Sequence, residues 1–268
     1  MKIGVLGKIS KVKDQSIIDG LLQYLKNCGH ETVLFHEPTE IVGVDVVVVL
    51  GGDGAILHSA VTAARNGVKI VGINYGNLGF LTEYEKEEGN AICELLADLR
   101  ENRCRILKRS LLEVEIAGKC YYALNEVAFQ RDSGLYVKSN TQILKIKVHT
   151  NEGTDEIAGD GLLFCTPTGS TAYSLSAGGA ILTPEVPVFM MTPLCAFSMR
   201  TRPVVFSDSE EIALKITSGK AIVSIDGQAV IGLPENAVVF IRKAPFTADF
   251  PVREQTDFFA KVRNKLNK

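Results

Sequence analysis

The most constraining feature of the sequence is an apolar run that stops at a glycine-rich tetrapeptide. Residues 44–50 are apolar except for Asp45, which is the pattern of a parallel strand buried on both faces. The run ends at the sequence GGDG, residues 51–54, and residues 56–64 then place apolar side chains at helical spacing. A strand that passes into a helix through glycines predicts an α/β domain with a ligand-binding loop at the carboxyl edge of its sheet.

The first hundred residues alternate between short apolar runs and amphipathic helical patterns. Strands are predicted at residues 2–6, 32–36, 44–50 and 69–73, and helices around residues 17–25, 56–64 and 92–99, with Gly29 ending the first helix. This alternation predicts a Rossmann-like, three-layer α/β nucleotide-binding domain over residues 1–103. Residues 256–266 predict a further helix, and we expect residues 250–268 to pack back on this domain.

From residue 104 onward the apolar period changes from helical to two. Strands are predicted at residues 112–116, 126–130, 144–149, 162–165, 204–207, 212–216, 221–225 and 238–242. Many short strands at close spacing, with turn residues between them, are typical of a β-sandwich. The sequence therefore predicts an all-β sandwich domain over residues 104–249.

Composition limits the possible partners and compartments. A net charge of −2 gives no basic field, so nucleic acid is not an expected partner. No apolar stretch is long enough to span a membrane, and the run at residues 3–6 is too short for a signal peptide, so a soluble, cytoplasmic protein is expected. The six cysteines are scattered without a C-x-x-C pair, which predicts buried thiols and neither a disulfide framework nor a zinc site.

Asp53 is the informative member of the GGDG loop. Glycines let backbone N–H groups approach a phosphate closely, and the start of the following helix adds positive potential. A carboxylate in such a loop would repel a phosphate unless it handles a proton or a cation, which indicates a hydroxyl acceptor or magnesium. The alternative is a tight turn in which the aspartate caps the next helix, and the tetrapeptide alone leaves both interpretations open.

Two further segments place polar residues among apolar ones. Asn125 and Glu126 lie at the start of an apolar strand. Two interpretations are open: the pair marks the edge of that strand, or it hydrogen-bonds a ribose and an adenine edge. Residues 166–179 combine small hydroxyl residues with glycines after a strand, which suits a nucleoside lying against backbone, with Tyr173 able to stack on it. Taken alone, residues 226–228 indicate a hairpin turn. Taken alone, His58 is expected to be a solvated residue on the helix that follows the GGDG loop.

Two common nucleotide-binding fingerprints are absent. Gly4 and Gly7 are not followed by the third glycine of G-x-G-x-x-G, which removes the main support for a dehydrogenase. No G-x-x-x-x-G-K-[ST] sequence is present either, which argues against a Walker-type kinase.

These segments, in this order and at these separations, resemble the NAD kinase family. The family pattern is matched by residues 51–54, 72–81, 125–126, 160–179, 192–194 and 202–203. The matches extend over most of residues 2–228, and the run at residues 166–179 is the most specific of them.

The resemblance implies a phosphotransferase that moves the γ-phosphate of ATP to the 2′-hydroxyl of the adenosine ribose of NAD and gives NADP. Asp53 would be the general base, and Mg²⁺ or another divalent cation would accompany ATP without a tightly bound protein metal site. The family fold is an α/β domain followed by a β-sandwich, with NAD between them, often in a homodimer or homotetramer.

The same resemblance assigns roles by position. The residues expected to bind NAD are Asp53, Gly54, His58, Asn125, Glu126, Asp160, Thr171, Ala172, Tyr173, Ser174, Leu175, Ser176 and Gln228, and those expected to shape the phosphate loop are Gly51, Gly52 and Gly54. Asn125 and Glu126 would hold the adenosine moiety, and Gln228 would contribute from the last part of the sandwich.

The chain departs from the family pattern at three places. Ala55 stands where threonine is usual, Ala196-Phe197 stands where a Pro-His pair is common, and residues 131–142 form a longer connection than usual. Arg131 and Lys138 are the candidates for the basic NAD contact of that connection. None of these changes affects Asp53, so activity is expected.

Two other functions compete with this interpretation. A lipid kinase of the diacylglycerol or sphingosine type shares the GGDG loop, but no amphipathic insertion indicates access to a membrane. A catalytically silent NAD(H)-binding sensor would use the same pocket, and the presence of Asp53 argues against it. The sequence leaves open whether polyphosphate replaces ATP, whether NADH is accepted, the oligomeric state and feedback by NADP.

Overall fold

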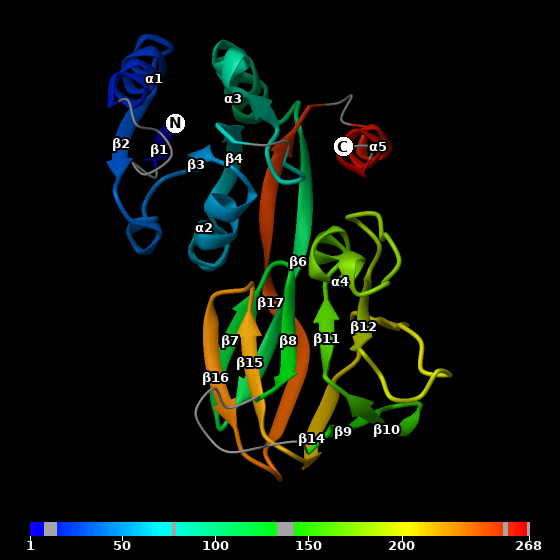
Figure 1. Ribbon diagram of the computed structural model, residues 1–268. Coiled ribbons are helices and arrows are strands. Elements are labelled where there is room, and N and C mark those ends of the chain that lie inside the picture. Colours follow the sequence, from blue (N-terminus) through cyan, green and yellow to red (C-terminus); the bar gives the residue numbers. More distant parts are fainter. Residues whose placement is uncertain (8–14, 77–78, 133–141, 254–256, 267–268) are drawn as a thin grey trace. The chain divides into compact units, whose positions relative to one another are not determined.

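The computed structural model describes residues 1–7, 15–76, 79–132, 142–253 and 257–266 (Figure 1). The chain divides into two compact units, one formed by Met1–Arg109 with Phe246–Lys268 and the other by Ser110–Pro245. The division falls within two long strands, β6 (Arg105–Ile116) and β17 (Val238–Val252). The predicted fold class, an α/β region followed by an antiparallel all-β region, is confirmed.

The first unit contains a five-stranded parallel sheet in the order β2-β1-β3-β4-β5. Its strands are β1 (Lys2–Gly7), β2 (Glu31–Phe35), β3 (Val46–Gly51), β4 (Lys69–Asn74) and β5 (Tyr84–Glu85). Since β1 lies between β2 and β3, the winding direction of the chain reverses there. Such a switch point, at the carboxyl ends of β1 and β3, is where open α/β sheets bind ligands.

Helices cover both faces of this sheet. α1 (Gln15–Asn27) and α3 (Ile92–Arg100) contribute to one core cluster together with alternate residues of β1, β3 and β4. α2 (Asp53–Arg65) packs on the other face, where Gly72 leaves room for Ile56. Gly29 has a φ of +81° just after α1, so the predicted helix stop is confirmed. Two 3-10 turns, Pro38–Glu40 and Lys86–Ala91, complete the unit's connections.

The second unit is a sandwich of two antiparallel six-stranded sheets, in the orders β10-β9-β14-β17-β6-β7 and β13-β12-β11-β8-β15-β16. Besides β6 and β17, its strands are β7 (Lys119–Ala123), β8 (Glu126–Arg131), β9 (Leu144–Thr150), β10 (Gly153–Gly159), β11 (Gly161–Cys165), β12 (Val188–Leu194), β13 (Val204–Ser207), β14 (Ile212–Ser218), β15 (Ala221–Ile225) and β16 (Ala229–Leu233). Inward-facing residues of both sheets form one core cluster, which includes Phe129, Phe164 and Val239. A 3-10 turn (Thr168–Thr171) and α4 (Tyr173–Ser176) follow β11.

The last helix, α5 (Phe258–Leu266), packs on the first unit. The Lys261 ammonium donates to the Thr82 carbonyl at 3.1 Å and lies 3.3 Å from a Glu83 carboxylate oxygen. Val262 is buried, whereas Phe259 and Leu266 are more than half exposed, so the apolar face predicted for this helix is only partly covered. No helix of the described residues is long and apolar enough to cross a membrane.

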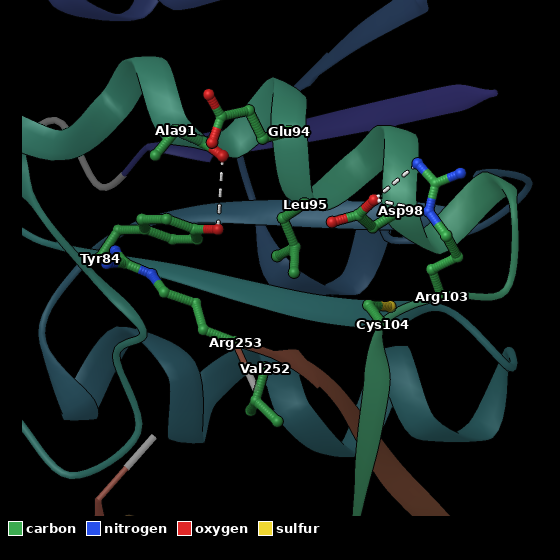
Figure 2. A pocket seen from close by; sticks show the side chains of 9 residues that line it. All are labelled: Tyr84, Ala91, Glu94, Leu95, Asp98, Arg103, Cys104, Val252 and Arg253. Atoms are coloured by element: carbon green, nitrogen blue, oxygen red, sulfur yellow. Dashed lines mark hydrogen bonds and ion pairs between the residues drawn. The ribbon is translucent and has the colours of Figure 1, made fainter. Parts of the chain in front are cut away.

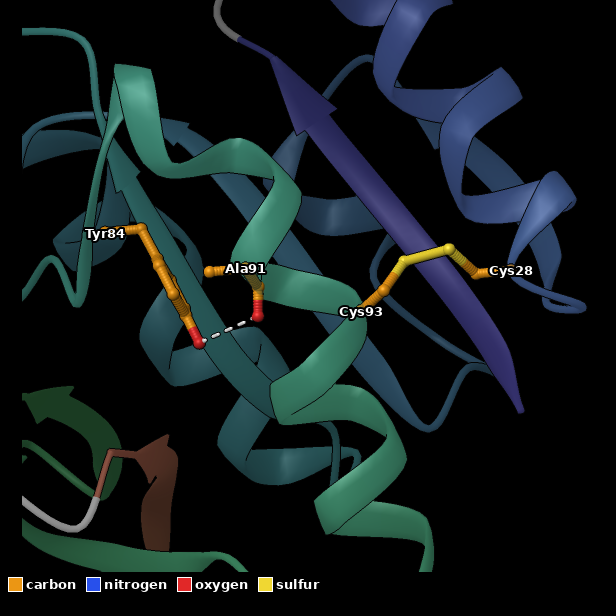
Figure 3. Close-up of a disulfide and its surroundings, with 4 residues drawn as sticks. All are labelled: Cys28, Tyr84, Ala91 and Cys93. Carbon is orange, nitrogen blue, oxygen red and sulfur yellow. Dashed lines mark hydrogen bonds between the residues drawn. A yellow bond between two sulfur atoms is a disulfide. The ribbon is translucent and has the colours of Figure 1, made fainter.

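Two of the six cysteines overturn the prediction of buried free thiols. Cys28, just after α1, forms a disulfide with Cys93 in α3, with their Cα atoms 6.5 Å apart (Figure 3). The spacing along the chain gave no sign of this pairing, because it arises only when α1 and α3 cover the same face of the sheet. Of the free cysteines, Cys165 is buried as predicted, whereas Cys120 and Cys195 are exposed.

Opening the disulfide is expected to destabilise the first unit. The bond closes a loop of 65 residues, and the chain-entropy relation gives about 4 kcal/mol for a loop of that size. We expect Cys93→Ser to lower the free energy of unfolding by about 2 to 4 kcal/mol in denaturant titrations followed by circular dichroism. Cys104→Ser, which removes a free thiol of the same unit, is the control. Superimposable unfolding curves for the wild type with and without reductant would contradict the cross-link.

Candidate functional site

The GGDG loop joins β3 to α2 at the switch point of the parallel sheet. β3 ends at Gly51, Gly52 is the N-cap in an extended conformation, and Asp53 is the first residue of α2. A Cβ on Gly51 would lie 2.6 Å from the Ala55 Cβ, so the first glycine is required by close packing of the turn. Gly54 is exposed in the first turn of the helix. The loop thus presents backbone at a helix N-terminus, which is the arrangement that binds phosphate.

The Asp53 carboxylate is held by backbone of a different loop. Its Oδ2 accepts the Phe80 N–H at 2.9 Å and its Oδ1 accepts the Leu81 N–H at 2.9 Å. Gly79 packs so closely that a Cβ there would collide with the carboxylate. The side chain nevertheless remains 26% exposed, so a ligand can reach it. These bonds fix the plane of the carboxylate. An aspartate that caps a helix accepts N–H groups of that helix, whereas Asp53 accepts N–H groups of a different loop.

The loop after β4 is bonded to the GGDG loop. The Tyr75 N–H donates to the Gly51 carbonyl at 3.0 Å. The Asn74 side chain is buried, with its amide 3.0 Å from Glu85 Oε2 and its Oδ1 accepting the Gly76 N–H at 3.0 Å. Residues 74–76 and 79–81, the described parts of this loop and of a segment that the family resemblance singled out, therefore build the second wall of the Asp53 site.

In the second unit, Asn125 and Glu126 lie where the chain enters β8, and both are more than nine-tenths buried. The Asp226 carboxylate accepts three consecutive backbone N–H groups there, from Leu124 at 2.8 Å, Asn125 at 2.8 Å and Glu126 at 3.0 Å. Asp226 has a φ of +47° and begins the three-residue turn between β15 and β16, so the predicted hairpin turn is confirmed. That turn also positions the Asn-Glu pair, which sequence reasoning did not reveal.

Glu126 is a buried carboxyl group with an unused oxygen. Burial first, and then the nearby Asp226 carboxylate, raise the pKa of Glu126 to about 7, although the Tyr173 N–H donates to it. Its Oε2 has no hydrogen-bond partner among the residues that the structure describes. A buried oxygen without a partner costs free energy, so a ligand that brings a donor to this atom gains from it.

The Ser/Thr-rich segment, residues 166–179, uses buried hydroxyl groups in hydrogen bonds to other groups of the protein. Thr166 Oγ1 donates to the Leu124 carbonyl at 2.6 Å, and Ser170 Oγ donates to the Pro167 carbonyl at 2.6 Å. The Ser174 hydroxyl is fully buried and lies 2.9 Å from Thr192 Oγ1. These hydroxyls shape the segment through bonds within the protein. The Ser174 hydroxyl anchors α4, and the expected contact of Ser174 with NAD remains a prediction.

Other members of the predicted NAD set surround a cavity of about 430 Å³ in the second unit. Asp160, Tyr173 and Ser176 line it together with Gln130, Ala177, Pro193, Leu194 and Cys195. The Gln130 amide donates to the Tyr173 hydroxyl at 3.1 Å, and Arg131 pairs with Asp160 at 3.2 Å. Thr171, Ala172 and Leu175 are partly exposed beside Tyr173. The structure thus groups Asp160 with α4, as a ligand site requires.

The remaining predicted residues have fewer recorded contacts. His58 lies exposed on α2 of the first unit, and Gln228 lies exposed in the β15–β16 turn of the second. The candidate basic residue Arg131 is already paired with Asp160, and Lys138 lies outside the described residues. No group of three or more metal-ligating side chains occurs among the residues that the structure describes.

A further cavity of about 430 Å³ lies in the first unit, beside α3 (Figure 2). It is lined by Tyr84, Ala91, Glu94, Leu95, Asp98, Arg103, Cys104, Val252 and Arg253. Arg103 donates to Asp98 at 2.9 Å, and the Tyr84 hydroxyl donates to the Ala91 carbonyl at 3.4 Å. It contains none of the predicted site residues.

The raised pKa of Glu126 predicts a dependence of stability on pH. The folded protein keeps this proton up to about pH 7, whereas the unfolded chain loses it near its ordinary value of 4.5. Stability therefore falls as pH rises through this window. Glu126→Gln cannot ionise, so its stability relative to wild type should rise between pH 4.5 and 7, by on the order of 1 to 3 kcal/mol.

Denaturant unfolding of both proteins at several pH values measures this difference. Glu235→Gln, at an exposed glutamate of the same unit, is the control and should follow the wild-type pH dependence. A stability difference between Glu126→Gln and wild type that stays constant over this range would refute the assignment.

Comparison with known proteins places these features in one family. Residues 7–104 match the family model of the ATP-NAD kinase N-terminal domain, and residues 124–251 match that of the ATP-NAD kinase C-terminal domain. The NAD kinase of Methanothermobacter thermautotrophicus is 34% identical, over 99% of this chain and 96% of that protein.

Two solved structures share the fold. An NAD kinase from Archaeoglobus fulgidus in complex with ATP has a TM-score of 0.79 at 28% identity, covering 98% of this chain and 99% of that one. Yeast NADH kinase complexed with NADH has a TM-score of 0.82, covering 100% of this chain and 87% of that one, and at 22% identity this likeness shows the fold alone. With both family models and a full-length relative in agreement, this chain belongs to the ATP-NAD kinase family.

Proposed function

We propose that the protein transfers the γ-phosphate of ATP to the 2′-hydroxyl of the adenosine ribose of NAD, giving NADP, with Asp53 as the general base. The observation that carries this proposal is the Asp53 carboxylate, which is accessible at the switch point of the sheet and held at both oxygens by backbone N–H groups. The Archaeoglobus relative was solved with ATP, which supports a nucleotide triphosphate as the donor.

Asp53 acts on the acceptor hydroxyl in this scheme. The ribose O2′ forms a bond to the γ-phosphorus, the bond from that phosphorus to the β-γ bridging oxygen breaks, and ADP leaves with the bonding electron pair. The hydroxyl proton passes to the Asp53 carboxylate. A carboxylate is a weak base toward a sugar hydroxyl, so the proton moves late in a loose transition state and orientation of the nucleophile matters most.

Asn125 and Glu126 are the proposed adenosine contacts. An adenine amino group or a ribose hydroxyl can donate to Glu126 Oε2, the atom without a hydrogen-bond partner in the described part of the chain. The Asn125 amide supplies both a donor and an acceptor beside it. The proposed contacts of the rest of the dinucleotide are Asp160, Thr171, Ala172, Tyr173, Ser174, Leu175 and Ser176, with Gly54, His58 and Gln228 as further contacts.

A divalent cation is proposed to arrive with ATP. Mg²⁺ in phosphoryl-transfer sites is bound mainly through substrate phosphates and water, with one or two carboxylates. When bound, it would offset negative charge on the phosphates.

The oligomeric state and compartment are further proposals. The family resemblance supports a homodimer or homotetramer and a cytoplasmic location. Since disulfides are rare in the reducing cytoplasm, the Cys28–Cys93 bond makes the thiol count of freshly isolated protein informative. Four free thiols would indicate an oxidising location and six a reducing one.

Asp53→Asn tests the proposed function. We expect purified wild type to make NADP from NAD, ATP and Mg²⁺, detected with an NADP-specific coupled dehydrogenase. The variant should lose the base and lower kcat by about 100-fold or more while still binding NAD. Asp98→Asn, at a half-exposed aspartate of α3 outside the proposed site, is the matched control. NAD binding by a wild type that makes no NADP would favour the silent sensor.

Asp226→Asn tests the proposed adenosine contacts. An asparagine offers one acceptor oxygen in place of two, and its amide opposes the N–H groups that Asp226 now binds. We expect KM for NAD to rise by about 10- to 100-fold, from a loss of about 1 to 3 kcal/mol, with little change in KM for ATP. Asp155→Asn, on the exposed part of β10, is the control. An equal rise in both KM values would mean that the variant only disturbs the fold.

A further inference from the structure

A lysine from the end of the chain lies against the proposed catalytic carboxylate. Lys265 Nζ is 3.4 Å from Asp53 Oδ2, although 212 residues separate the two in sequence. The same ammonium group lies 4.2 Å from the centre of the Phe80 ring, whose backbone N–H binds the same carboxylate oxygen. The Lys265 side chain is 36% exposed and the Asp53 side chain 26%, so neither is closed off from solvent.

The position of Lys265 is fixed by the docking of α5. Lys261 lies four residues earlier, so both lysines project from the same face of the helix. Lys261 donates to the Thr82 carbonyl at 3.1 Å and pairs with Glu83, and Val262 is buried beside it. The helix is therefore anchored on residues 80–83, the same segment that supplies the N–H groups to Asp53.

Stability alone does not account for this ion pair. A pair with both side chains partly exposed contributes about 0.2 to 1 kcal/mol, and the Asp53 oxygens already accept two backbone N–H groups. Lys265 carries three N–H donors. Its recorded contacts within the described residues are one Asp53 oxygen and the Phe80 ring, which leaves donors for an anion.

The charge of the loops explains why a cation is needed here. Residues 51–58 and 72–83 contain no lysine or arginine, and Asp53 and Glu83 make these segments acidic. A triphosphate that approaches the GGDG loop meets the Asp53 carboxylate, and the repulsion must be offset by positive charge. The Lys265 ammonium is the side-chain cation that the structure records in contact with Asp53.

We propose that Lys265 is a catalytic residue of the donor site, whose ammonium binds the phosphoryl group being transferred. The inference rests on the proposed function. Lys265 pairs with Asp53 in the free protein and donates to γ-phosphate oxygens when ATP is bound. While the new O2′–phosphorus bond forms and the bond to ADP breaks, Lys265 keeps its proton and stabilises the charge on those oxygens.

The binding experiment compares ATP with ADP by calorimetry on the full-length protein. Lys265→Met, which keeps the length of the side chain and removes its charge, should weaken ATP binding by about tenfold or more and leave ADP binding unchanged. Lys265→Arg should retain the preference for ATP. Arg263→Met removes a charge from the same helix, where Arg263 pairs with Asp257, and should behave as wild type. An equal loss for ATP and ADP would overturn the proposal.

The kinetic experiment separates a catalytic role from an effect through Asp53. Lys265→Met should lower kcat by about 10- to 1000-fold at every pH, with the dissociation constant for NAD unchanged. If Lys265 only tuned Asp53, the acid limb of the pH–rate profile would move and kcat would recover at high pH, which would overturn the assignment. A wild type that binds ATP without making NADP would refute the proposed function, while the ATP and ADP comparison would still test Lys265.

Discussion

Buried loops at strand ends leave backbone N–H groups that need acceptors, and both units meet this need with an aspartate. In the first unit Asp53 accepts the N–H groups of Phe80 and Leu81. In the second, Asp226 accepts those of three consecutive residues at the start of β8. Each carboxylate fixes the conformation of a loop distant in sequence, and the loop held by Asp226 carries the proposed site residues Asn125 and Glu126.

The two carboxylates differ in what else they can do. Burial raises the pKa of Asp226, although its three N–H donors act in the opposite direction, and its oxygens are occupied by backbone. It is therefore a positioning group. Asp53 accepts two backbone N–H groups in place of three and remains accessible, with the Lys265 ammonium beside it, so a ligand can still reach its oxygens.

The sequence predicted the parts of the fold that repeat a simple period. The apolar run of β3 and the helical pattern after it identified the GGDG loop, and strand spacing identified the sandwich. β10 was missed because most of its residues are exposed, so no alternation marks it. Lys265 and the Cys28–Cys93 bond were missed because each joins residues brought together only by tertiary packing. A motif can predict Asp53, but no local pattern predicts its partners.

Segment 79–83 connects these partners in the first unit. It gives two N–H groups to Asp53, its Thr82 carbonyl binds Lys261, and its Glu83 carboxylate binds Lys261 and the Arg253 N–H. A movement of this segment would therefore displace the proposed base, Asp53, and the helix that carries Lys265 together. Since Gly79 lacks space for a side chain, the segment packs closely against Asp53. The relative position of Asp53 and Lys265 is thus set by one short stretch of backbone, and the proposed phosphoryl transfer requires rigid support of this kind.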